Sequence, residues 1–351
     1  MNPRRSTSEL CVGRIRIGSG HPISVQSMTK TDTRDAETTL NQITSLACAG
    51  CEIVRVAVPD MEAAESLAKI ILKSPLPVIA DIHFDWRLAL KAIENGVHCL
   101  RLNPGNIGAR WKVEEVVAAA TERSVPIRIG VNAGSLEKHL IDKYGHPTPE
   151  AIVESAEGHI SILEDLGYDK IKVSLKASDV LRTVEAYRIF SAKHDYPLHI
   201  GISESGPPST GIIKSSVGLG VLLYEGIGDT IRVSLTSEPE EEVRVAYEIL
   251  KSLGLRERGA NLISCPTCGR CEIDMRPLAQ KVQDALKNIT KPVTVAVMGC
   301  VVNGPGEARE ADFGVAGGKG IGLVFKKGEV VKQVKEEDLL DALMDEINRA
   351  E

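Results

Sequence analysis

The feature that most constrains the fold is an alternation between short β-rich runs and segments with helical apolar spacing. Eight such runs fall within about 230 residues, the number and length typical of a (β/α)8 barrel. Segments such as 61–73, 85–95 and 178–194 follow the runs and carry apolar residues at helical spacing. The runs are 23–28, 53–58, 77–82, 99–104, 126–132, 171–176, 198–203 and 230–235. We therefore predict an α/β protein with a TIM-like barrel.

A doubly wound open sheet is the competing architecture for such an alternation. That fold usually has a glycine-rich turn directly after its first strand. No such turn follows residues 23–28. The barrel is therefore the favoured architecture.

Composition narrows the class of protein. The chain has 351 residues, of which 43% are hydrophobic and 26% charged, so it can build one large and one small core. Its net charge of −6 disfavours a general nucleic-acid binder, which needs excess Lys and Arg. No apolar run approaches the roughly 18 residues of a membrane-spanning helix, and Arg14 and Arg16 interrupt any signal core. We expect a cytoplasmic chain without membrane contact.

Polar residues recur with period two in the predicted strands, where buried parallel strands are usually apolar throughout. Alternate residues of a strand share one face, so we expect these side chains to point into the barrel. Arg55 has the same parity in its own strand. The residues are Asp81 and His83, Arg101 and Asn103, Arg128 and Asn132, Lys172, Ser174 and Lys176, and Arg232 and Ser234.

The inward residues predict an anionic ligand. An internal ion-pair network is the alternative, but cations outnumber acids on this face, and buried unpaired cations are costly. The sequence Lys214-Ser215-Ser216 is expected to open the helix after the seventh strand, where such barrels commonly hold phosphate. Thr236 and Ser237 follow the eighth strand in the equivalent place. A phosphorylated or diphosphorylated small molecule fits this mouth best.

The C-terminal part has a different order of expected strands and helices. This order predicts a small α+β domain with its own core. We place the barrel at residues 1–240 and the second domain at residues 241–351. The expected strands are 261–264, 293–298, 313–316, 322–325 and 330–334, and the expected helices are 275–288 and 336–349.

Four of the eight cysteines lie in this second domain and suggest a metal or redox site, because disulfides are rare in the cytosol. Cys265 and Cys268 form a C-x2-C pair, and Cys300 lies in a Gly/Pro turn that also presents Glu307. With Cys271, four thiolates could bind zinc or an ordinary [4Fe–4S] cluster. Without it, three thiolates and a carboxylate would leave one iron with an exchangeable ligand. From the residues alone, a cluster, zinc and no metal all remain open.

Two of these segments resemble the iron–sulfur signature of the 4-hydroxy-3-methylbut-2-enyl diphosphate synthase family. They are Cys265-Pro-Thr-Cys268-Gly-Arg and Gly299-Cys300-Val-Val-Asn-Gly-Pro-Gly-Glu307-Ala. The resemblance runs along the whole chain. It includes Ser24-Val-Gln-Ser-Met-Thr, Glu52-Ile-Val-Arg-Val-Ala-Val-Pro, Arg101-Leu-Asn-Pro-Gly-Asn, Arg128-Ile-Gly-Val-Asn and Val173-Ser-Leu-Lys-Ala-Ser.

The resemblance implies an architecture and a cofactor. The fold would be a TIM-like barrel akin to dihydropteroate synthase, followed by a small α+β iron–sulfur domain related to sulfite-reductase modules. One [4Fe–4S] cluster per chain would be held by Cys265, Cys268, Cys300 and Glu307, so Cys271 would not be a ligand. The family is a homodimer in which the cluster domain of one chain covers the barrel of the other.

The resemblance also implies an activity in the non-mevalonate pathway of isoprene biosynthesis. The enzyme would be an iron–sulfur oxidoreductase that takes electrons from flavodoxin or ferredoxin. It would carry out a two-electron reductive ring opening and dehydration of 2-C-methyl-D-erythritol 2,4-cyclodiphosphate, giving 4-hydroxy-3-methylbut-2-enyl diphosphate. Glu204 would handle protons, and Glu307 would belong to the catalytic centre. The substrate contacts would be Arg55, Arg101, Arg128, Asn132, Lys176, Arg232, Ser234 and Asn303.

Two other interpretations remain to be weighed against this function. Lys176 ends the sixth predicted strand, where a Schiff-base aldolase acting on a phosphorylated substrate could keep its lysine, with a structural zinc domain appended. An iron–sulfur carrier without enzymatic activity would have no use for the inward cations. The sequence assigns no roles to Cys271, His83 and His199.

Overall fold

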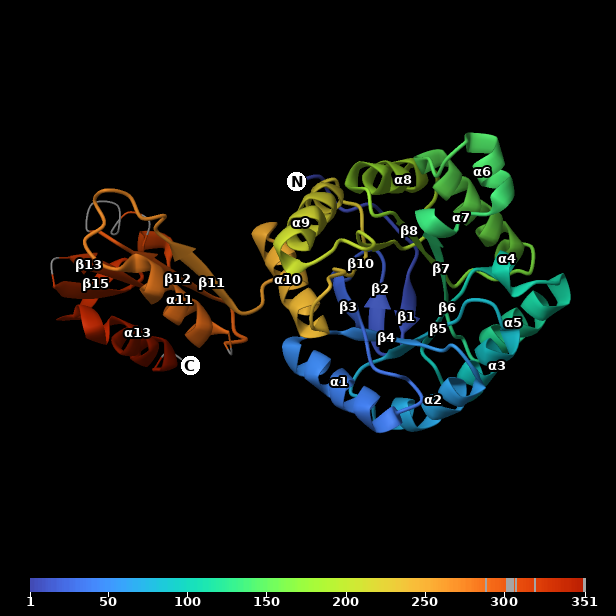
Figure 1. The fold of residues 1–351 in the computed structure, drawn as a ribbon, viewed down its shortest axis with the longest axis horizontal. Helices are drawn as coiled ribbons and strands as arrows, with labels where there is room; N and C mark the ends of the chain where they lie inside the picture. The colour runs from blue at the N-terminus through green and yellow to red at the C-terminus, as the bar shows by residue number, and fades with distance from the viewer. Residues whose placement is uncertain (288, 301–305, 307, 319, 350–351) are drawn as a thin grey trace. The chain divides into compact units, whose positions relative to one another are not determined.

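Eight parallel strands form the centre of the N-terminal unit, and helices surround them (Figure 1). The computed structural model describes residues 1–287, 289–300, 306, 308–318 and 320–349. The strand order is β8-β7-β6-β5-β4-β3-β10-β9, and a parallel bridge between Val173 and Leu198 joins the two ends of the sheet. The predicted barrel is therefore confirmed. Its strands are β3 (Ser24–Met28), β4 (Ile53–Ala57), β5 (Val78–Asp81), β6 (Cys99–Arg101), β7 (Ile127–Asn132), β8 (Ile171–Lys176), β9 (His199–Ile200) and β10 (Thr230–Ile231).

Several of the helices begin where the sequence supplies a capping side chain. Asp60, Asp85 and Asp179 each accept a backbone N–H from the first turn of the following helix, which satisfies an otherwise unpaired donor. Outward strand residues such as Val54 and Ile129 pack against the helices in one continuous core. The helices are α1 (Ala36–Ala49), α2 (Met61–Lys73), α3 (Trp86–Glu94), α4 (Pro104–Ile107), α5 (Arg110–Glu122), α6 (Lys138–Tyr144), α7 (Pro149–Glu164), α8 (Val180–Lys193), α9 (Pro208–Tyr224) and α10 (Pro239–Ser252), with a 3-10 turn at Ala133–Ser135.

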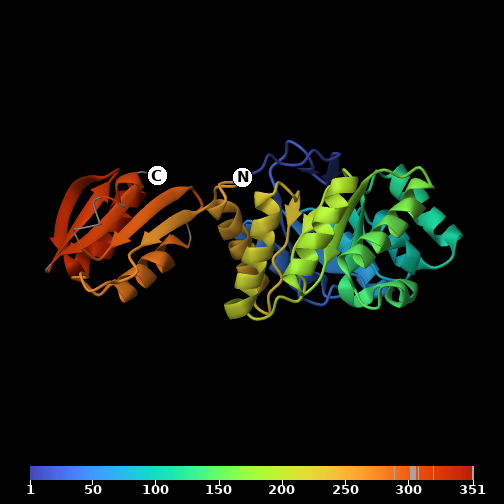
Figure 2. The same cartoon turned by 90° about the horizontal axis from the view of Figure 1, so that it is seen from above.

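An N-terminal hairpin closes one end of the barrel. It consists of β1 (Leu10–Val12) and β2 (Ile15–Ile17), and its apolar side chains pack against Ile53, Ile79 and Cys99. These three residues lie at or near the beginnings of their strands, so the hairpin covers the N-terminal end of the barrel (Figure 2). The opposite end, where the strands finish, is left for a site.

The boundary between the two compact units falls after Arg256, so the units are Met1–Arg256 and Glu257–Glu351. The sequence placed the boundary after residue 240. The difference arises because α10 packs on β3 and α1 and contributes Val243 and Leu250 to the barrel core. A hydrogen bond from the Tyr247 hydroxyl to the carbonyl of Gly50 also ties this helix to the barrel.

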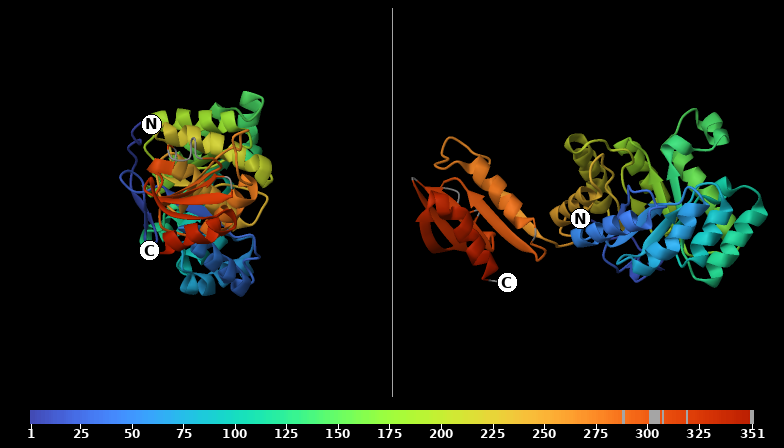
Figure 3. Two further views of the ribbon diagram at one scale, coloured as in Figure 1. Left: turned by 90° about the vertical axis from the view of Figure 1, so that its left-hand side faces the viewer. Right: turned by 60° about the horizontal axis from the view of Figure 1, so that its bottom comes forward.

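The second unit is a five-stranded sheet with helices α11 (Met275–Leu286) and α13 (Leu339–Asn348) packed on one face (Figure 3). Side chains such as Val295, Val315 and Val324 form the core between this face and the helices. The first three strands in the order are parallel and the last two antiparallel, which confirms the predicted α+β class. The strands are β11 (Ala260–Ser264), β12 (Val293–Met298), β13 (Phe313–Gly318), β14 (Ile321–Lys326) and β15 (Glu329–Lys335), with 3-10 turns at Ala308–Glu310 and Glu336–Asp338.

Within the described parts of the chain, the helices lack the combination of length and apolar composition that crossing a bilayer requires.

Candidate active site

The cationic side chains predicted from strand parity meet at the C-terminal mouth of the barrel. Arg55 lies in β4, Arg101 ends β6, and Arg128 lies in β7. Lys176 ends β8, and Arg232 directly follows β10. Together they line a cavity of about 80 Å³. The structure thus brings together Arg55, Arg101, Arg128, Asn132, Lys176, Arg232 and Ser234, with Ser174, Ile202 and Ser203 completing the lining.

A buried carboxylate on β5 holds one side of the mouth. Asp81 Oδ1 lies 3.3 Å from Arg101 Nη1, and Asp81 Oδ2 lies 3.8 Å from Arg55 Nε. Burial raises the pKa of Asp81, but the charges of Arg55 and Arg101 and a hydrogen bond from His83 outweigh burial and hold it below its ordinary value. Asp81 is therefore ionised and partly compensates its two arginines.

The opposite side of the mouth has one further acid, Glu242 of α10, which lies 3.3 Å from Arg232. Five lining cations thus face two carboxylates, an excess of three positive charges. Among the described residues, no carboxylate forms an ion pair with Arg128 or Lys176. An anion is the natural counterpart of this excess.

Burial and neighbouring cations lower the pKa of several lining residues, Arg128 and Lys176 among them. Burial lowers the pKa of Arg128 to about 10, and repulsion from Arg101 acts in the same direction. Burial, Arg128 and Arg232 lower the pKa of Lys176 well below its ordinary value. Arg128 Nε and Nη1 have no hydrogen-bond partner within the described ranges. Both residues therefore gain from a bound anion.

Two glycines make room for these cations. A Cβ atom at Gly130 would lie 2.6 Å from Arg101 Nε, and one at Gly201 would lie 2.9 Å from Lys176 Nζ. The Gly130 carbonyl also accepts hydrogen bonds from Arg101 Nη2 at 2.8 Å and from Asn103 Nδ2 at 3.1 Å. Gly130 thus fixes the direction of the Arg101 guanidinium, a role that sequence reasoning missed.

The two histidines left without a role occupy different environments. His83 is half-exposed and lies 3.1 Å from Arg101 Nη1, at the rim of the mouth. His199 is fully buried, and its Nδ1 lies 2.7 Å from the Thr230 hydroxyl. Burial and the nearby cations Lys176 and Arg128 lower the pKa of His199 well below its ordinary value, so this ring is neutral.

Lys172 lies deeper in the barrel than the mouth residues. It is fully buried, and its Nζ has no hydrogen-bond partner among the residues that the structure describes. Burial lowers its pKa to about 8. The expectation that Lys172 points into the barrel agrees with this environment.

Glu204 lies in the loop after β9, at the mouth end of the barrel, and its side chain is exposed. Its φ of 52° is in the left-handed region, which is strained for a residue other than glycine and often marks a functional position. Glu204 is not among the residues that line the cavity. Its role in handling protons stays a prediction.

The expected phosphate site at Lys214-Ser215-Ser216 is wrong. Helix α9 begins at Pro208, six residues earlier, so Lys214 lies inside the helix and its side chain is exposed. The reason is that Pro207 and Pro208 start the helix, since proline is favoured in the first turn.

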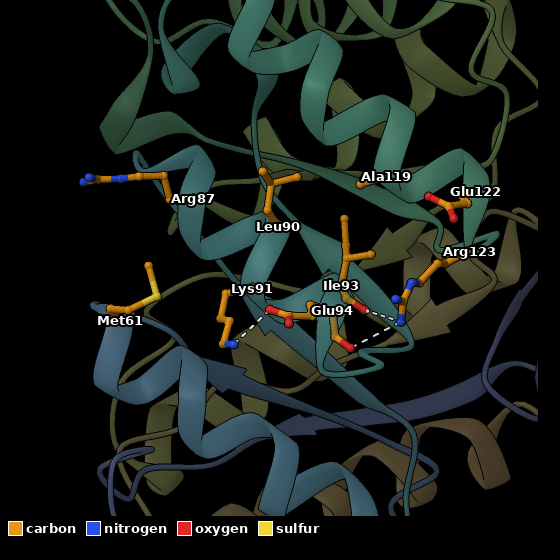
Figure 4. Close-up of a pocket in the computed structure, with 9 residues that line it drawn as sticks. All are labelled: Met61, Arg87, Leu90, Lys91, Ile93, Glu94, Ala119, Glu122 and Arg123. Atoms are coloured by element: carbon orange, nitrogen blue, oxygen red, sulfur yellow. Dashed lines mark hydrogen bonds and ion pairs between the residues drawn. The ribbon is translucent and has the colours of Figure 1, made fainter.

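A second cavity, of about 380 Å³, lies on the outside of the barrel between α2, α3 and α5 (Figure 4). Three of its charged side chains have local partners: Lys91 pairs with Glu94 at 2.9 Å, and Arg123 Nη1 donates to the Glu94 carbonyl at 3.2 Å. It contains none of the residues predicted to bind substrate. The mouth of the barrel is therefore the candidate active site.

The cysteines of the second unit follow two neighbouring parallel strands. Cys265 directly follows β11, and Cys300 comes two residues after β12. A hydrogen bond of 3.0 Å from the Cys265 amide to the Val297 carbonyl continues this pairing. Cys268 is exposed, and a hydrogen bond from the backbone of Arg270 lowers the pKa of its thiol. A low thiol pKa favours the thiolate that metals bind.

Thiols such as these are common metal ligands, and the sequence predicts that three of them bind a cluster together with Glu307. Glu307 and Asn303 lie outside the described residues. Among the described residues, no group of three His, Cys, Asp or Glu side chains could hold a metal ion. Cys271 is half-buried, and its Sγ donates to the Ile273 carbonyl at 3.2 Å, so it is engaged within its own segment. Cys265, Cys268 and Cys300 all belong to the described residues, and the structure does not bring them together as a metal site; their role as cluster ligands stays a prediction.

Comparison with known proteins decides the family. Residues 7–247 match the model of the GcpE TIM-barrel domain, and residues 261–349 match that of the GcpE protein C-terminal domain. The chain belongs to the GcpE family. A relative from Thermodesulfovibrio yellowstonii is 63% identical over 99% of this chain and 100% of its own length. One from Geobacter sulfurreducens is 64% identical over 99% of this chain and 98% of its own length. Both GcpE relatives are named 4-hydroxy-3-methylbut-2-en-1-yl diphosphate synthase (flavodoxin).

The family predicted from the sequence is therefore confirmed, and the predicted function agrees with the names of these GcpE relatives. The aldolase alternative is not favoured. Among solved structures, dihydropteroate synthase from Yersinia pestis matches with a TM-score of 0.52 and 13% identity, over 71% of this chain and 100% of its own. Dihydropteroate synthase from Xanthomonas albilineans matches with a TM-score of 0.50 and 12% identity, over 71% of this chain and 99% of its own. At such identities these matches show the barrel fold alone.

Proposed function

We propose that this chain converts 2-C-methyl-D-erythritol 2,4-cyclodiphosphate to 4-hydroxy-3-methylbut-2-enyl diphosphate in isoprenoid biosynthesis. The reaction consumes two electrons and two protons and releases one water. The observation that carries the proposal is the excess of three positive charges at the barrel mouth, in a chain whose relatives are named for this synthase. A cyclic diphosphate carries the negative charge that such a mouth would bind.

The cations would do more than bind substrate. Reductive opening breaks a ring carbon–oxygen bond and leaves the electron pair on the diphosphate oxygen, so negative charge on the diphosphate increases along the reaction. Arg128 and Lys176 have no carboxylate ion-pair partner among the described residues, and their charges are available to stabilise it. Fixed positive charges stabilise the transition state more than the substrate when charge develops during the step.

The other predicted contacts complete this proposal. Asn132 and Ser234 line the same cavity and would donate hydrogen bonds to the ligand. Asn303, outside the described residues, would contact substrate from the second unit. Glu204 would act as the general acid that supplies a proton during loss of water.

We also propose one [4Fe–4S] cluster per chain, with Cys265, Cys268, Cys300 and Glu307 as its ligands. When bound, the cluster would pass electrons one at a time from the donor to the substrate. The relatives' names specify flavodoxin, which we propose as the donor, with ferredoxin as the alternative. The proposal assigns substrate binding to the barrel and the cluster to the C-terminal unit, in a cytoplasmic homodimer.

The test begins with protein purified without oxygen. Iron and acid-labile sulfide are measured per chain, and EPR spectra of the reduced protein are recorded with and without the cyclic diphosphate. We expect four irons, a reduced signal that changes when substrate is added, and turnover with reduced flavodoxin. One zinc and no sulfide would overturn the proposal. Borohydride trapping of a carbonyl substrate on Lys176 would then support the aldolase.

A further inference from the structure

The first turn of α10 buries a carboxylate that the proposed reaction leaves without a role. Glu242 is 1% exposed, whereas its neighbour Glu241 remains partly exposed and pairs with Arg244 on the same helix. An ionised carboxylate that is fully buried is costly unless it is paired and hydrogen-bonded. The contacts of the Glu242 carboxylate therefore indicate its role.

Four groups from two segments converge on this carboxylate. Oε1 accepts a hydrogen bond of 3.0 Å from the Leu235 amide, and Oε2 accepts one of 3.2 Å from the Ser27 hydroxyl of β3. Arg232 Nη2 lies 3.3 Å from Oε2, and Lys30 Nζ lies 3.7 Å from Oε1. Glu242 thus joins the end of β3, the segment after β10 and the start of α10.

The contact with Arg232 matters because this arginine lines the cavity. Glu242 engages Nη2, while Arg232 Nε is buried without a hydrogen-bond partner in the part of the chain that the structure describes. The guanidinium is therefore held on one side by Glu242 and keeps N–H groups for a ligand on the other. A planar guanidinium that is fixed in this way can bind a phosphate with little loss of side-chain entropy.

The same carboxylate also fixes the segment that follows Arg232. Lys30, which pairs with Glu242, donates to the carbonyls of Leu235 and Ser237. Leu235 itself donates its amide to Glu242. Ser234, which lines the cavity, lies between Arg232 and this anchored segment. Glu242 thus controls two of the lining residues without lining the cavity itself.

We propose that Glu242 is a positioning residue that orients Arg232 and the segment after β10 for the diphosphate of the substrate. This inference rests on the proposed function, because it assumes that a diphosphate occupies the mouth. On the other side of the mouth, Asp81 has the equivalent relation to Arg55 and Arg101. Glu242 acts through Arg232 and does not touch the reacting atoms.

The test compares steady-state kinetics of the complete holoenzyme and two variants with the cyclic diphosphate and reduced flavodoxin. Glu242→Gln keeps the shape but removes the charge, and we expect KM to rise about ten- to a hundredfold, the cost of a misplaced charge-assisted hydrogen bond. We expect kcat to change less than KM. The control Glu241→Gln removes a charge from the same helical turn and should leave KM unchanged. A Glu242→Gln variant with normal KM and reduced kcat would indicate a structural role only and would overturn the inference.

A double variant keeps the inference testable if Glu242→Gln folds poorly. Arg232→Gln and the double variant Arg232→Gln/Glu242→Gln should differ in KM much less than wild type and Glu242→Gln do, because the part of the Glu242 effect that passes through Arg232 is already lost. Additive effects on KM would overturn the inference. Affinity for inorganic pyrophosphate is measured on every protein by calorimetry. If wild-type protein binds pyrophosphate but does not turn over the cyclic diphosphate, the proposed function fails, while the pyrophosphate affinities still decide the role of Glu242.

Discussion

Replacing Arg128 with methionine should make the ligand-free protein more stable than wild type. With a diphosphate bound, the variant should be less stable than wild type. Arg128 is 1% exposed, and two of its nitrogens have no hydrogen-bond partner among the described residues. A buried polar group left unsatisfied costs about 1–3 kcal/mol, and apolar replacement of buried charges is often neutral or stabilising by ~1–4 kcal/mol. Methionine has a similar length, so little cavity is left behind. We expect the free energy of unfolding to rise by about 1–3 kcal/mol.

Binding should change in the opposite direction. A guanidinium that donates two charge-assisted hydrogen bonds to a diphosphate contributes about 1.5–3 kcal/mol for each bond. Arg128→Met should therefore weaken inorganic pyrophosphate binding by about a hundredfold or more. Because a ligand stabilises only the state that binds it, millimolar pyrophosphate should raise the melting temperature of wild type much more than that of the variant.

Thermal unfolding of the holoenzyme with and without pyrophosphate tests both effects. Without ligand the variant should melt several degrees above wild type, since about 1 kcal/mol corresponds to ~2–4 °C for a unit of this size. With pyrophosphate the order should reverse. The control is Arg87→Met, which replaces an exposed arginine paired with Asp85. It should leave the melting temperature nearly unchanged, both with and without pyrophosphate. A variant that melts lower than wild type without ligand would refute the argument that the mouth carries uncompensated charge.

Three further outcomes are expected. Cys300→Ser should lose iron and the visible absorbance of a cluster; full absorbance would contradict its assignment as a ligand. Cys271→Ser should keep both, because Cys271 already donates to the Ile273 carbonyl, and loss of the cluster would restore the model with four thiolates. Lys172→Met should remove a pH dependence of stability. With a folded pKa of about 8, wild-type Lys172 loses its proton in the folded state first, so between pH 8 and 10 the free energy of unfolding should rise relative to the variant by up to ~1.4 kcal/mol per pH unit. Equal pH profiles in urea unfolding would contradict this assignment.

Local periodicity was enough to place most of the mouth residues. The side-chain direction in a strand alternates with every residue, so the parity of Arg55, Arg101 and Arg128 could be read from short segments and agrees with the structure. The prediction about Lys214 failed because a helix boundary depends on the residues that start it, and the prolines before Lys214 start α9 earlier.

Glu242 shows what short-range patterns do not contain. It belongs to a run of acids, Glu240-Glu241-Glu242, that resembles the solvent face of a helix. Only the packing of α10 on β3 buries this one side chain against Ser27 and Arg232. The role of Gly130 is similarly tertiary, since the group that needs its space, Arg101, comes from the neighbouring strand.

The hairpin β1–β2 closes one end of the barrel, so the site opens at the other end alone. Its apolar side chains cover the end of the barrel at Ile53, Ile79 and Cys99, and Lys172 lies fully buried above them. Whatever binds among the arginines must leave by the route along which it entered. Product and incoming substrate therefore cannot pass each other, and each cycle has to empty the mouth before the next begins.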